Sequence, residues 1–515
     1  MSDRHIDLEV GLGSAGSTGW SRILQQEGLR HRGEDVQSAP VVVLEDELPD
    51  WTEDYVSAGG VAVVSGAPSG AGLLPDSIEG VIGGFERPDA PRLCTAPTLA
   101  RLFSGQGKGV CRLHERRVRK NGMDPGRFPL ILRRRVGRGW LLFTGVPLTR
   151  LLMAHGDTLR RFSPHSDVTE RVSSIDKAEV ADTLVWLLRT AFAAAGLPYV
   201  RPVRFPHGAA SVLIFRIDVD GAYGDRCAAL AKVASAHGVP LSIFVNRQLC
   251  EEHPGTLPPH GDGGTDGGTV RHEIGQHGST HNLFDTVADN LANLRAGAAW
   301  VEERTGVVAR SFVAPRGMWN PALGQALAEM GYRYSSDFGL DFDSLPFRVP
   351  GSGILQIPVH PYSPERAVEH AREHGSPPVT PAAVAAHYLA VVQQQVAANR
   401  PTHVYGHPEV LGAMADQVLP TVFADVRRRG LRTMTLAQMT DWWELREGAG
   451  MRARVQAGTG TLLVDYDAER LPVEVDGADG LDVMVAGARR RVPVGERSVL
   501  LPADGVISAA ARPPS

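Results

Sequence analysis

The chain is organised around Ser211-Val-Leu-Ile-Phe-Arg-Ile-Asp-Val-Asp-Gly221. A short run of mostly branched apolar residues that ends at a glycine is typical of a buried strand followed by a turn. Asp218 and Asp220 close this run, and residues two apart on a strand point to the same side. Carboxylates at the end of a buried strand need a partner or a metal ion to offset their desolvation. The stretch therefore predicts one site that both aspartates face.

A second stretch carries two histidines four residues apart, in Glu273-Ile-Gly-Gln-His-Gly-Ser-Thr-His281. On a helical turn this spacing places His277 and His281 on one face, which suits a single metal ion. With 18 histidines in the chain, a chance pair is the alternative. Combined with the aspartates, the histidines make a two-histidine, one-carboxylate set with open positions for water and substrate.

Size and composition narrow the class of protein. A chain of 515 residues predicts two or three domains. The net charge of −5, without a sustained basic stripe, argues against a nucleic-acid binder. The four cysteines lack CxxC spacing, which argues against a disulfide framework and a thiolate zinc site. The N-terminus lacks the apolar region of a secretion signal and no stretch could span a bilayer, so we expect a cytoplasmic protein without a membrane partner.

The pattern of elements divides the chain into four parts. Residues 1–165 alternate strand and helix patterns, which predicts a parallel sheet with helices on its faces. Residues 166–206 hold a bridging helix and a linker, and residues 207–446 repeat strand and helix again. Residues 447–515 contain short strands split by Gly and Asp, which predicts a small all-β module.

The N-terminal part loosely resembles the class I glutamine-amidotransferase-like domains, which have a flavodoxin-like parallel sheet. The resemblance lies in Gly59-Gly60 before one strand and Phe143-Thr-Gly-Val-Pro147 after another. Those enzymes need a cysteine on a sharp turn, where this chain has Ser65-Gly-Ala-Pro68, so we expect a catalytically silent domain. Gly11-Leu-Gly-Ser-Ala-Gly16 formally matches GxGxxG, but a flexible loop is favoured over a pyrophosphate site.

From about residue 211 to 445 the chain resembles the polysaccharide deacetylases, the NodB-homology family of carbohydrate esterases. Four motifs carry this resemblance in the family's order: Ile217-Asp-Val-Asp220, Gly275-Gln-His-Gly-Ser-Thr-His281, Phe312-Val-Ala-Pro-Arg-Gly317 and Val404-Tyr-Gly-His-Pro408. The resemblance implies a distorted (β/α) barrel with its site at the C-terminal ends of the strands. It also implies one divalent metal ion, usually zinc, with cobalt, nickel or manganese as alternatives.

The resemblance further implies a role for each motif residue. Asp220, His277 and His281 would hold the metal ion. Asp218 would be the base that activates water, and His407 the acid that protonates the leaving amine. The backbone N–H of Arg316 would stabilise the oxyanion.

The third motif departs from the family's pattern. Many members have an arginine that orients the base, and Val313 stands in its place here, with Arg316 at the position of a tyrosine. Arg316 would either reach Asp218 or form a surface salt bridge. Candidate substrate-binding residues, each with a purely structural role as the alternative, are Trp319, Phe338, His360 and Tyr405.

Three functional hypotheses follow. The first is a metal-dependent hydrolase that removes an N-acetyl group from an amino sugar or a related small glycan-like substrate. The second keeps the metal but cleaves a non-sugar C–N bond, in a peptide-like or cyclic amide. The third is a non-catalytic carbohydrate-binding or scaffold protein. The hydrolase hypothesis implies a small molecule or an oligosaccharide as the binding partner. The sequence does not specify an oligomeric state.

Overall fold

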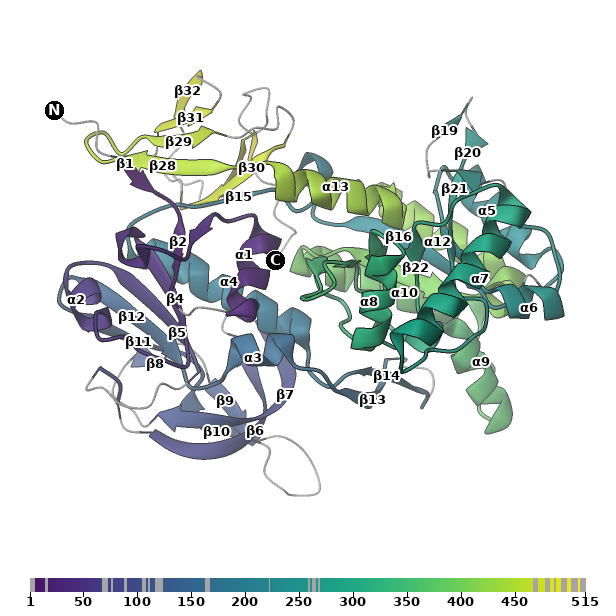
Figure 1. The fold of residues 1–515 in the computed structure, drawn as a ribbon, viewed down its shortest axis with the longest axis horizontal. Helices are drawn as coiled ribbons and strands as arrows, with labels where there is room; N and C mark the ends of the chain where they lie inside the picture. The colour runs from purple at the N-terminus through teal and green to yellow at the C-terminus, as the bar shows by residue number, and fades with distance from the viewer. Residues whose placement is uncertain are drawn as a thin grey trace. The chain divides into compact units, whose positions relative to one another are not determined.

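The structure is a computed structural model of the whole chain. It describes His5 to Ala509 except for residues 14–16, 67–72, 76, 88–89, 104–107, 110–111, 116–123, 163–166, 222, 258–259, 262–264, 267–268, 466–470, 478–481, 486–487, 492–497 and 502–507. The chain forms two compact units (Figure 1). The N-terminal unit comprises Met1–His155, Ser174–Val203 and Leu445–Ala511, and the barrel unit comprises Gly156–Ser173 and Arg204–Glu444.

The barrel unit is built on one curled sheet of mostly parallel strands. Its main path runs β24-β25-β23-β22-β21-β17-β16-β26, and β27 pairs with β16. The strands are β16 (Val212–Val219), β17 (Ser242–Val245), β21 (His272–Gln276), β22 (Ser311–Phe312), β23 (Tyr334–Ser335), β24 (Phe347–Arg348), β25 (Leu355–Gln356), β26 (Thr402–Gly406) and β27 (Arg432–Met434). The predicted α/β barrel-like fold is therefore confirmed as a curled half-barrel.

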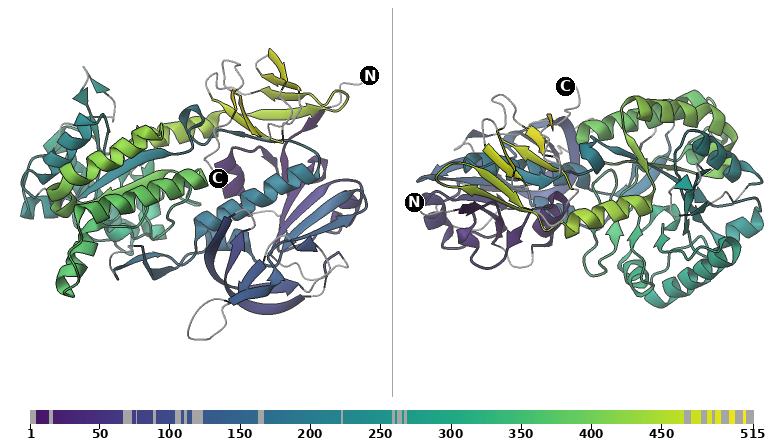
Figure 2. Two further views of the ribbon diagram at one scale, coloured as in Figure 1. Left: turned by 180° about the vertical axis from the view of Figure 1, so that it is seen from behind. Right: turned by 90° about the horizontal axis from the view of Figure 1, so that it is seen from above.

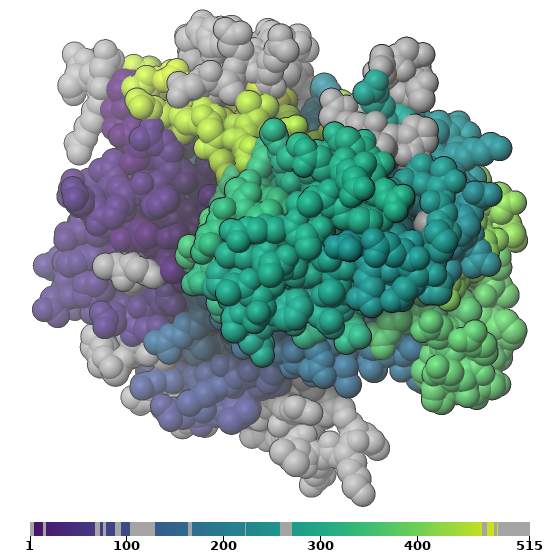
Figure 3. All heavy atoms as spheres, turned by 45° about the vertical axis from the view of Figure 1, so that its right-hand side comes forward, coloured from purple at the N-terminus to yellow at the C-terminus, as the bar shows by residue number. Residues whose placement is uncertain are grey.

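Helices cover the outside of this sheet, as the view from above shows (Figure 2). In the space-filling view, the atoms coloured teal belong to this part of the chain (Figure 3). The helices are α5 (Arg226–Ala236), α6 (Arg247–Glu252), α7 (Val287–Thr305), α8 (Pro321–Glu329), α9 (Pro364–Glu373), α10 (Pro381–Ala398), α11 (Pro408–Leu411), α12 (Ala415–Arg428) and most of α13 (Leu436–Gly448). Strand β16 is buried along its whole length, which explains its nearly continuous apolar run. No helix in the described part of the chain is long and apolar enough to cross a membrane.

The N-terminal unit contains the predicted parallel sheet. Its order is β3-β2-β4-β5-β12-β11-β8, with parallel pairing from β3 through β12. The elements of this layer are β2 (Val10–Leu12), β3 (His31–Arg32), β4 (Val41–Glu45), β5 (Val61–Ser65), β8 (Lys108–Gly109), β11 (Leu132–Val136) and β12 (Gly139–Thr144), with helices α1 (Thr18–Glu27), α2 (Thr52–Ser57), α3 (Leu148–Met153) and α4 (Lys177–Ala194). The likeness to amidotransferases stays a prediction. The sequence analysis singled out two loops, residues 11–16 and 65–68. The second half of each, residues 14–16 and residues 67–68, lies outside the described residues.

An antiparallel sheet that the sequence analysis did not anticipate also belongs to this unit. Its order is β10-β9-β6-β7. The strands are β6 (Ser77–Arg87), β7 (Ala90–Phe103), β9 (Arg112–Glu115) and β10 (Asp124–Pro129). It interrupts the alternation of strand and helix between β5 and β11, where the sequence shows no clear hydrophobic period.

The C-terminal strands are not a separate module, contrary to the prediction. They are β28 (Arg452–Gln456), β29 (Leu462–Asp465), β30 (Val473–Asp476), β31 (Asp482–Val485), β32 (Ala488–Arg491), β33 (Ser498–Leu501) and β34 (Ser508–Ala509). Strand β1 (His5–Asp7) pairs with β28, and β15 (Tyr199–Pro202) pairs with β30. Apolar residues of β28, β29 and β30 share one core with β2 and α4, because short strands cannot bury a core of their own.

A hairpin also lies in a different unit from the one its sequence position predicted. Strands β13 (Asp157–Arg161) and β14 (Thr169–Ser173) pair antiparallel in the chain that leads from α3 to α4. The flanking segments belong to the N-terminal unit, whereas the hairpin belongs to the barrel unit. The domain border predicted at residue 165 therefore falls inside this hairpin.

Candidate active site

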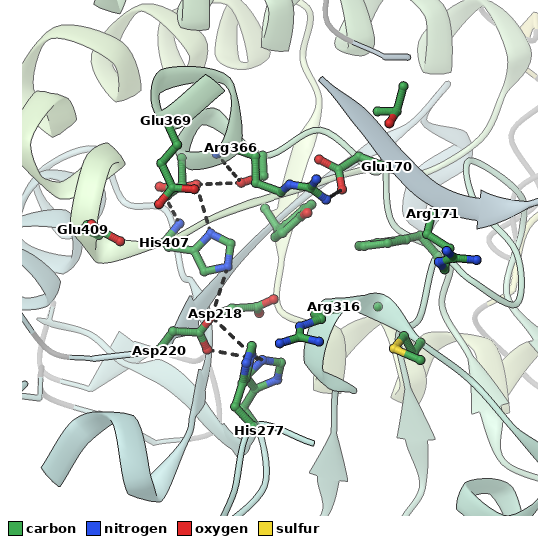
Figure 4. A pocket seen from close by; sticks show the side chains of 18 of the residues that line it. Glu170, Arg171, Asp218, Asp220, His277, Arg316, Arg366, Glu369, His407 and Glu409 are labelled. Atoms are coloured by element: carbon green, nitrogen blue, oxygen red, sulfur yellow. Dashed lines mark hydrogen bonds and ion pairs between the residues drawn. The ribbon is translucent and has the colours of Figure 1, made fainter. Parts of the chain in front are cut away.

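The candidate site is a cavity of about 760 Å³ in the barrel unit, next to the C-terminal ends of β16, β21 and β26. All six residues given catalytic or metal-binding roles by the resemblance line it: Asp218, Asp220, His277, His281, Arg316 and His407. Figure 4 shows five of these side chains gathered at one place, those of Asp218, Asp220, His277, Arg316 and His407. The structure thus brings together residues that are up to 189 positions apart, from Asp218 to His407.

Asp220, His277 and His281 form a compact donor set. The Nε2 atom of His277 lies 3.3 Å from Oδ1 of Asp220, and that of His281 lies 3.3 Å from Oδ2. The two Nε2 atoms are 3.2 Å apart. Among the described residues this is the group whose ligand atoms all lie within 4.8 Å of one another.

The histidine pair does not lie on a helical turn, as its spacing suggested. It follows β21 in a loop that Gly278 turns with a φ of +89°. Asn293 of α7 holds this loop, since its Oδ1 accepts hydrogen bonds from the backbone N–H groups of Ser279 (3.0 Å) and Thr280 (2.8 Å). The left-handed glycine lets the chain reverse between the histidines.

The tautomer of His277 suits a metal ligand. Its Nδ1 lies 2.7 Å from the carbonyl oxygen of Val313. A carbonyl only accepts hydrogen bonds, so Nδ1 carries the proton and Nε2 presents a lone pair. Burial lowers the pKa of His277, which favours this neutral form. Val313 thus contributes its backbone carbonyl oxygen to the site.

The acidic member of the set is ionised. Burial raises the pKa of Asp220, but its electrostatic interactions with His277 and His407 and a hydrogen bond from His281 lower it overall. Its buried Oδ1 has no hydrogen-bond partner. Two imidazoles and a carboxylate with an unsatisfied buried oxygen fit a divalent ion such as zinc.

Arg216 orients Asp218. Its Nη2 donates a 2.7 Å hydrogen bond to Oδ2 of Asp218, and its Nη1 donates to the carbonyl oxygen (2.7 Å) and Oγ (3.0 Å) of Ser336. The guanidinium lies 4.9 Å from the centre of the Tyr405 ring on the neighbouring strand. The Arg216 side chain is fully buried. The second carboxylate oxygen of Asp218, Oδ1, has no hydrogen-bond partner. One oxygen is anchored and the other is free to take a proton.

The sequence analysis missed this arginine, and it considered Arg316 for the role instead. The signal was available, because Arg216 interrupts an apolar run and lies two residues before Asp218 on the same strand. No hydrogen bond or ion pair joins the Arg316 side chain to Asp218 among the described residues. Arg316 is exposed at the wall of the cavity.

The backbone at Arg316 is unusual. Its φ of +58° lies in the left-handed region, which residues other than glycine rarely adopt. Its N–H donates no hydrogen bond within the described part of the chain, while the next N–H, of Gly317, donates to Ala314 (3.0 Å). A strained turn at a cavity wall is typical of a functional site.

Glu365 of α9 holds His407, a pairing that the sequence analysis did not foresee. Oε2 of Glu365 lies 2.9 Å from Nδ1 of His407, and Oε1 accepts from the backbone N–H of His407 at 3.0 Å. Burial lowers the pKa of His407, but the charge and hydrogen bond of Glu365, with the charges of Asp220 and Asp218, raise it to about 10. His407 is therefore protonated, and its Nε2 lies 3.6 Å from Oδ2 of Asp220.

The four predicted substrate-binding residues divide into two pairs. Phe338 and Tyr405 line the cavity. Trp319 and His360 are absent from the described lining: Trp319 packs against apolar clusters beside α8, and His360 is buried with Nδ1 3.0 Å from Oδ1 of Asp343. Their side chains have structural partners, which their sequence positions could not reveal.

Comparison with known proteins finds similarity among solved structures. No protein-family model and no curated protein matches the chain. A structure described as a candidate polysaccharide deacetylase from Mycobacterium smegmatis matches with a TM-score of 0.38 and 18% identity, over 48% of this chain and 94% of that one. A structure described as a candidate polysaccharide deacetylase from Pseudomonas aeruginosa PAO1 matches with a TM-score of 0.38 and 15% identity, over 49% of this chain and 96% of that one.

An allantoinase structure matches with a TM-score of 0.36 and 15% identity, over 47% of this chain and 92% of that one. Solved structures similar to this chain thus include polysaccharide deacetylases. The TM-scores of these three structures lie below 0.5, so the function of this protein is inferred from the residues of its own site.

Proposed function

We propose that this protein is a metal-dependent hydrolase that removes an N-acetyl group from an amino sugar or a related small glycan-like substrate. One observation carries the proposal. A donor set for a divalent ion, an ionisable carboxylate with a free oxygen and a protonated histidine line the same cavity. Metal-assisted hydrolysis of an amide uses these three functions at one carbonyl group.

Asp220, His277 and His281 would hold the metal ion, for which zinc is our preferred identity. A divalent ion there supplies Lewis-acid polarisation of the substrate carbonyl and lowers the pKa of water. Asp218 takes the proton of the attacking water on its free Oδ1, while Arg216 fixes the other oxygen. The free N–H of Arg316 donates to the oxygen that becomes negative during the attack.

His407 then protonates the leaving nitrogen. Its proton is on the ring near neutral pH because Glu365 stabilises the imidazolium. Glu365 also keeps the ring in place through the backbone of His407. An amine is a poor leaving group without this proton, so the acid is needed for C–N cleavage.

The cavity suits a small substrate. Its volume of about 760 Å³ lies in the range of roughly 300–1,000 Å³ typical of small-molecule sites. Phe338 gives it an apolar wall, on which the apolar face of a sugar ring can pack.

A substrate screen with added zinc or cobalt tests the proposal. Purified protein is incubated with acetylated amino sugars and with small non-sugar amides, and released amine is measured. Release from the sugars supports the proposal. Release from the non-sugar amides alone would replace it with the amidase hypothesis, and a protein that binds no stoichiometric divalent ion would contradict both.

A further inference from the structure

The β13–β14 hairpin, from outside the predicted barrel segment, forms part of the cavity wall. Leu159 of β13 and three residues of β14, Thr169, Glu170 and Arg171, line the cavity. The strands pair in register from Asp157 with Ser173 to Arg161 with Thr169. The barrel unit therefore takes part of its site from a segment that the deacetylase motifs do not include.

Alternation along β14 turns Glu170 and Val172 towards the body of the unit. Val172 is fully buried in a cluster with Phe338, Phe342, Val359 and Tyr405. The backbone N–H of Ser173 also donates to the carbonyl oxygen of Phe338. Two of the contacted residues, Phe338 and Tyr405, also line the cavity, so these contacts fix the position of β14 at the cavity wall.

The Glu170 carboxylate is buried, and only one of its two oxygens accepts a hydrogen bond. Its side chain is 4% exposed, and Oε2 accepts a 2.6 Å hydrogen bond from Nη1 of Arg366 on α9. Its Oε1 is buried without a hydrogen-bond partner. Leaving a buried carboxylate oxygen unpaired is costly, and such atoms are rare in folded proteins. Burial raises the pKa of Glu170 to about 7, even though Arg366 and His407 lower it.

The surroundings of Glu170 favour a neutral donor over a cation. Figure 4 shows Arg366, Arg171 and Arg316 on the same side of the cavity as Glu170, while Glu369 and Glu409 lie on the other side of His407. A positively charged ligand group next to Glu170 would face these guanidinium groups. A hydroxyl group donates a hydrogen bond without that repulsion.

We propose that Glu170 is a specificity-determining residue whose Oε1 accepts a hydrogen bond from a ring hydroxyl of the substrate. This inference rests on the proposed function, and it identifies the substrate as a hydroxylated, sugar-like amide. Removal of the acceptor weakens binding of hydroxylated substrates and leaves amides without hydroxyls unaffected. The hairpin thereby gives the site its preference for sugars.

The test compares two amides of similar ring size in the zinc-loaded full chain. N-acetylglucosamine carries hydroxyls, and N-acetylcyclohexylamine does not. For Glu170→Ala we expect kcat/KM on the sugar to fall about 10- to 100-fold, the range for a lost hydrogen bond to a charged group, with no change on the hydroxyl-free amide. Glu170→Gln keeps an acceptor oxygen and should lose less.

A matched control addresses the hairpin itself. Asp157→Asn breaks the exposed ion pair between Asp157 and Arg171 on the same hairpin, and Asp157 does not line the cavity. This variant should behave as wild type with both amides. An equal loss with both amides in Glu170→Ala would show a structural role and overturn the inference.

Calorimetry separates this inference from the proposed function. Binding of N-acetylglucosamine to wild type and to Glu170→Ala is measured directly, without any need for turnover. Weaker binding by Glu170→Ala supports the inference even if no hydrolysis occurs, an outcome that would contradict only the proposed function. Equal binding by both proteins would overturn the inference, whatever the hydrolytic activity.

Discussion

The guanidinium of Arg216 donates a 2.7 Å hydrogen bond to Asp218, two residues further along the same strand. Both side chains are buried at the end of β16, and the same guanidinium is held by Ser336 and by the Tyr405 ring. The residue that orients Asp218 thus comes from the same strand as Asp218 itself.

Replacement of Arg216 by methionine should reduce kcat strongly and leave the metal bound. The change removes one member of a buried ion pair, which typically costs about 3–5 kcal/mol of stability. We expect kcat to fall at least about 100-fold, because Asp218 loses the hydrogen bond that orients it. Steady-state kinetics and metal analysis check this.

A double-mutant cycle with Asp218→Asn supplies the control for Arg216. If Arg216 acts through Asp218, Arg216→Met adds little further loss in kcat once Asp218 is neutral. Independent, multiplicative losses would contradict the assignment of Arg216 as a positioning residue.

Loss of a metal ligand should remove both the ion and its stabilising effect. Wild-type protein saturated with zinc at about 100 times the dissociation constant gains roughly 2.7 kcal/mol of stability. His281→Ala should lose stoichiometric zinc and the rise in melting temperature that zinc causes. His374→Ala, at the exposed end of α9, is the matched control and should retain both. Retention of zinc by His281→Ala would remove His281 from the ligand set.

The contribution of His407 should depend on the leaving group. For an amide that releases an alkyl amine, His407→Ala should lower kcat by about 10²- to 10⁴-fold, the usual contribution of a general acid. For a 4-nitroanilide, whose leaving group needs less protonation, the loss should be smaller. Glu365→Gln should show the same trend with a smaller loss. The substitution removes the charge that stabilises the protonated form of His407, but it leaves the His407 ring in the site.

Equal losses for the two leaving groups would argue that His407 binds substrate rather than protonating the leaving nitrogen. Metal content of the His407→Ala protein should remain stoichiometric, since His407 is outside the donor set. This measurement excludes an indirect effect through the metal.

Stability should depend on pH through Glu170. Burial raises its pKa from 4.5 to about 7 in the folded protein, and the groups that face it are Arg366 and His407. Between pH 4.5 and about pH 7, Glu170 is protonated in the folded protein and ionised in the unfolded chain. The free energy of unfolding therefore falls as the pH rises through this range. The full loss corresponds to about 3 kcal/mol above pH 7.

Glu170→Gln should therefore be more stable than wild type at pH 8, and the gain should shrink towards pH 5. Melting temperatures of both proteins at the two pH values check this expectation. A variant that is less stable than wild type at pH 8 would show that the Arg366 ion pair outweighs the burial of the carboxylate.

Local patterns in the sequence were sufficient for several parts of the fold and site. The apolar run of β16 and the parallel sheets follow from short-range periodicity and turn residues. The aspartates at the end of β16 needed no tertiary information to be grouped, because alternation along one strand places them on one side.

Only the tertiary structure decided which residues support that site. Glu365 meets His407 across 42 positions, and Glu170 meets Arg366 across 196, so no local pattern could pair them. The C-terminal strands and the β13–β14 hairpin likewise take their places by burying apolar residues in cores built by distant segments. Periodicity records which face of an element is buried, but the partner of a buried charge is set by the packing of the whole chain.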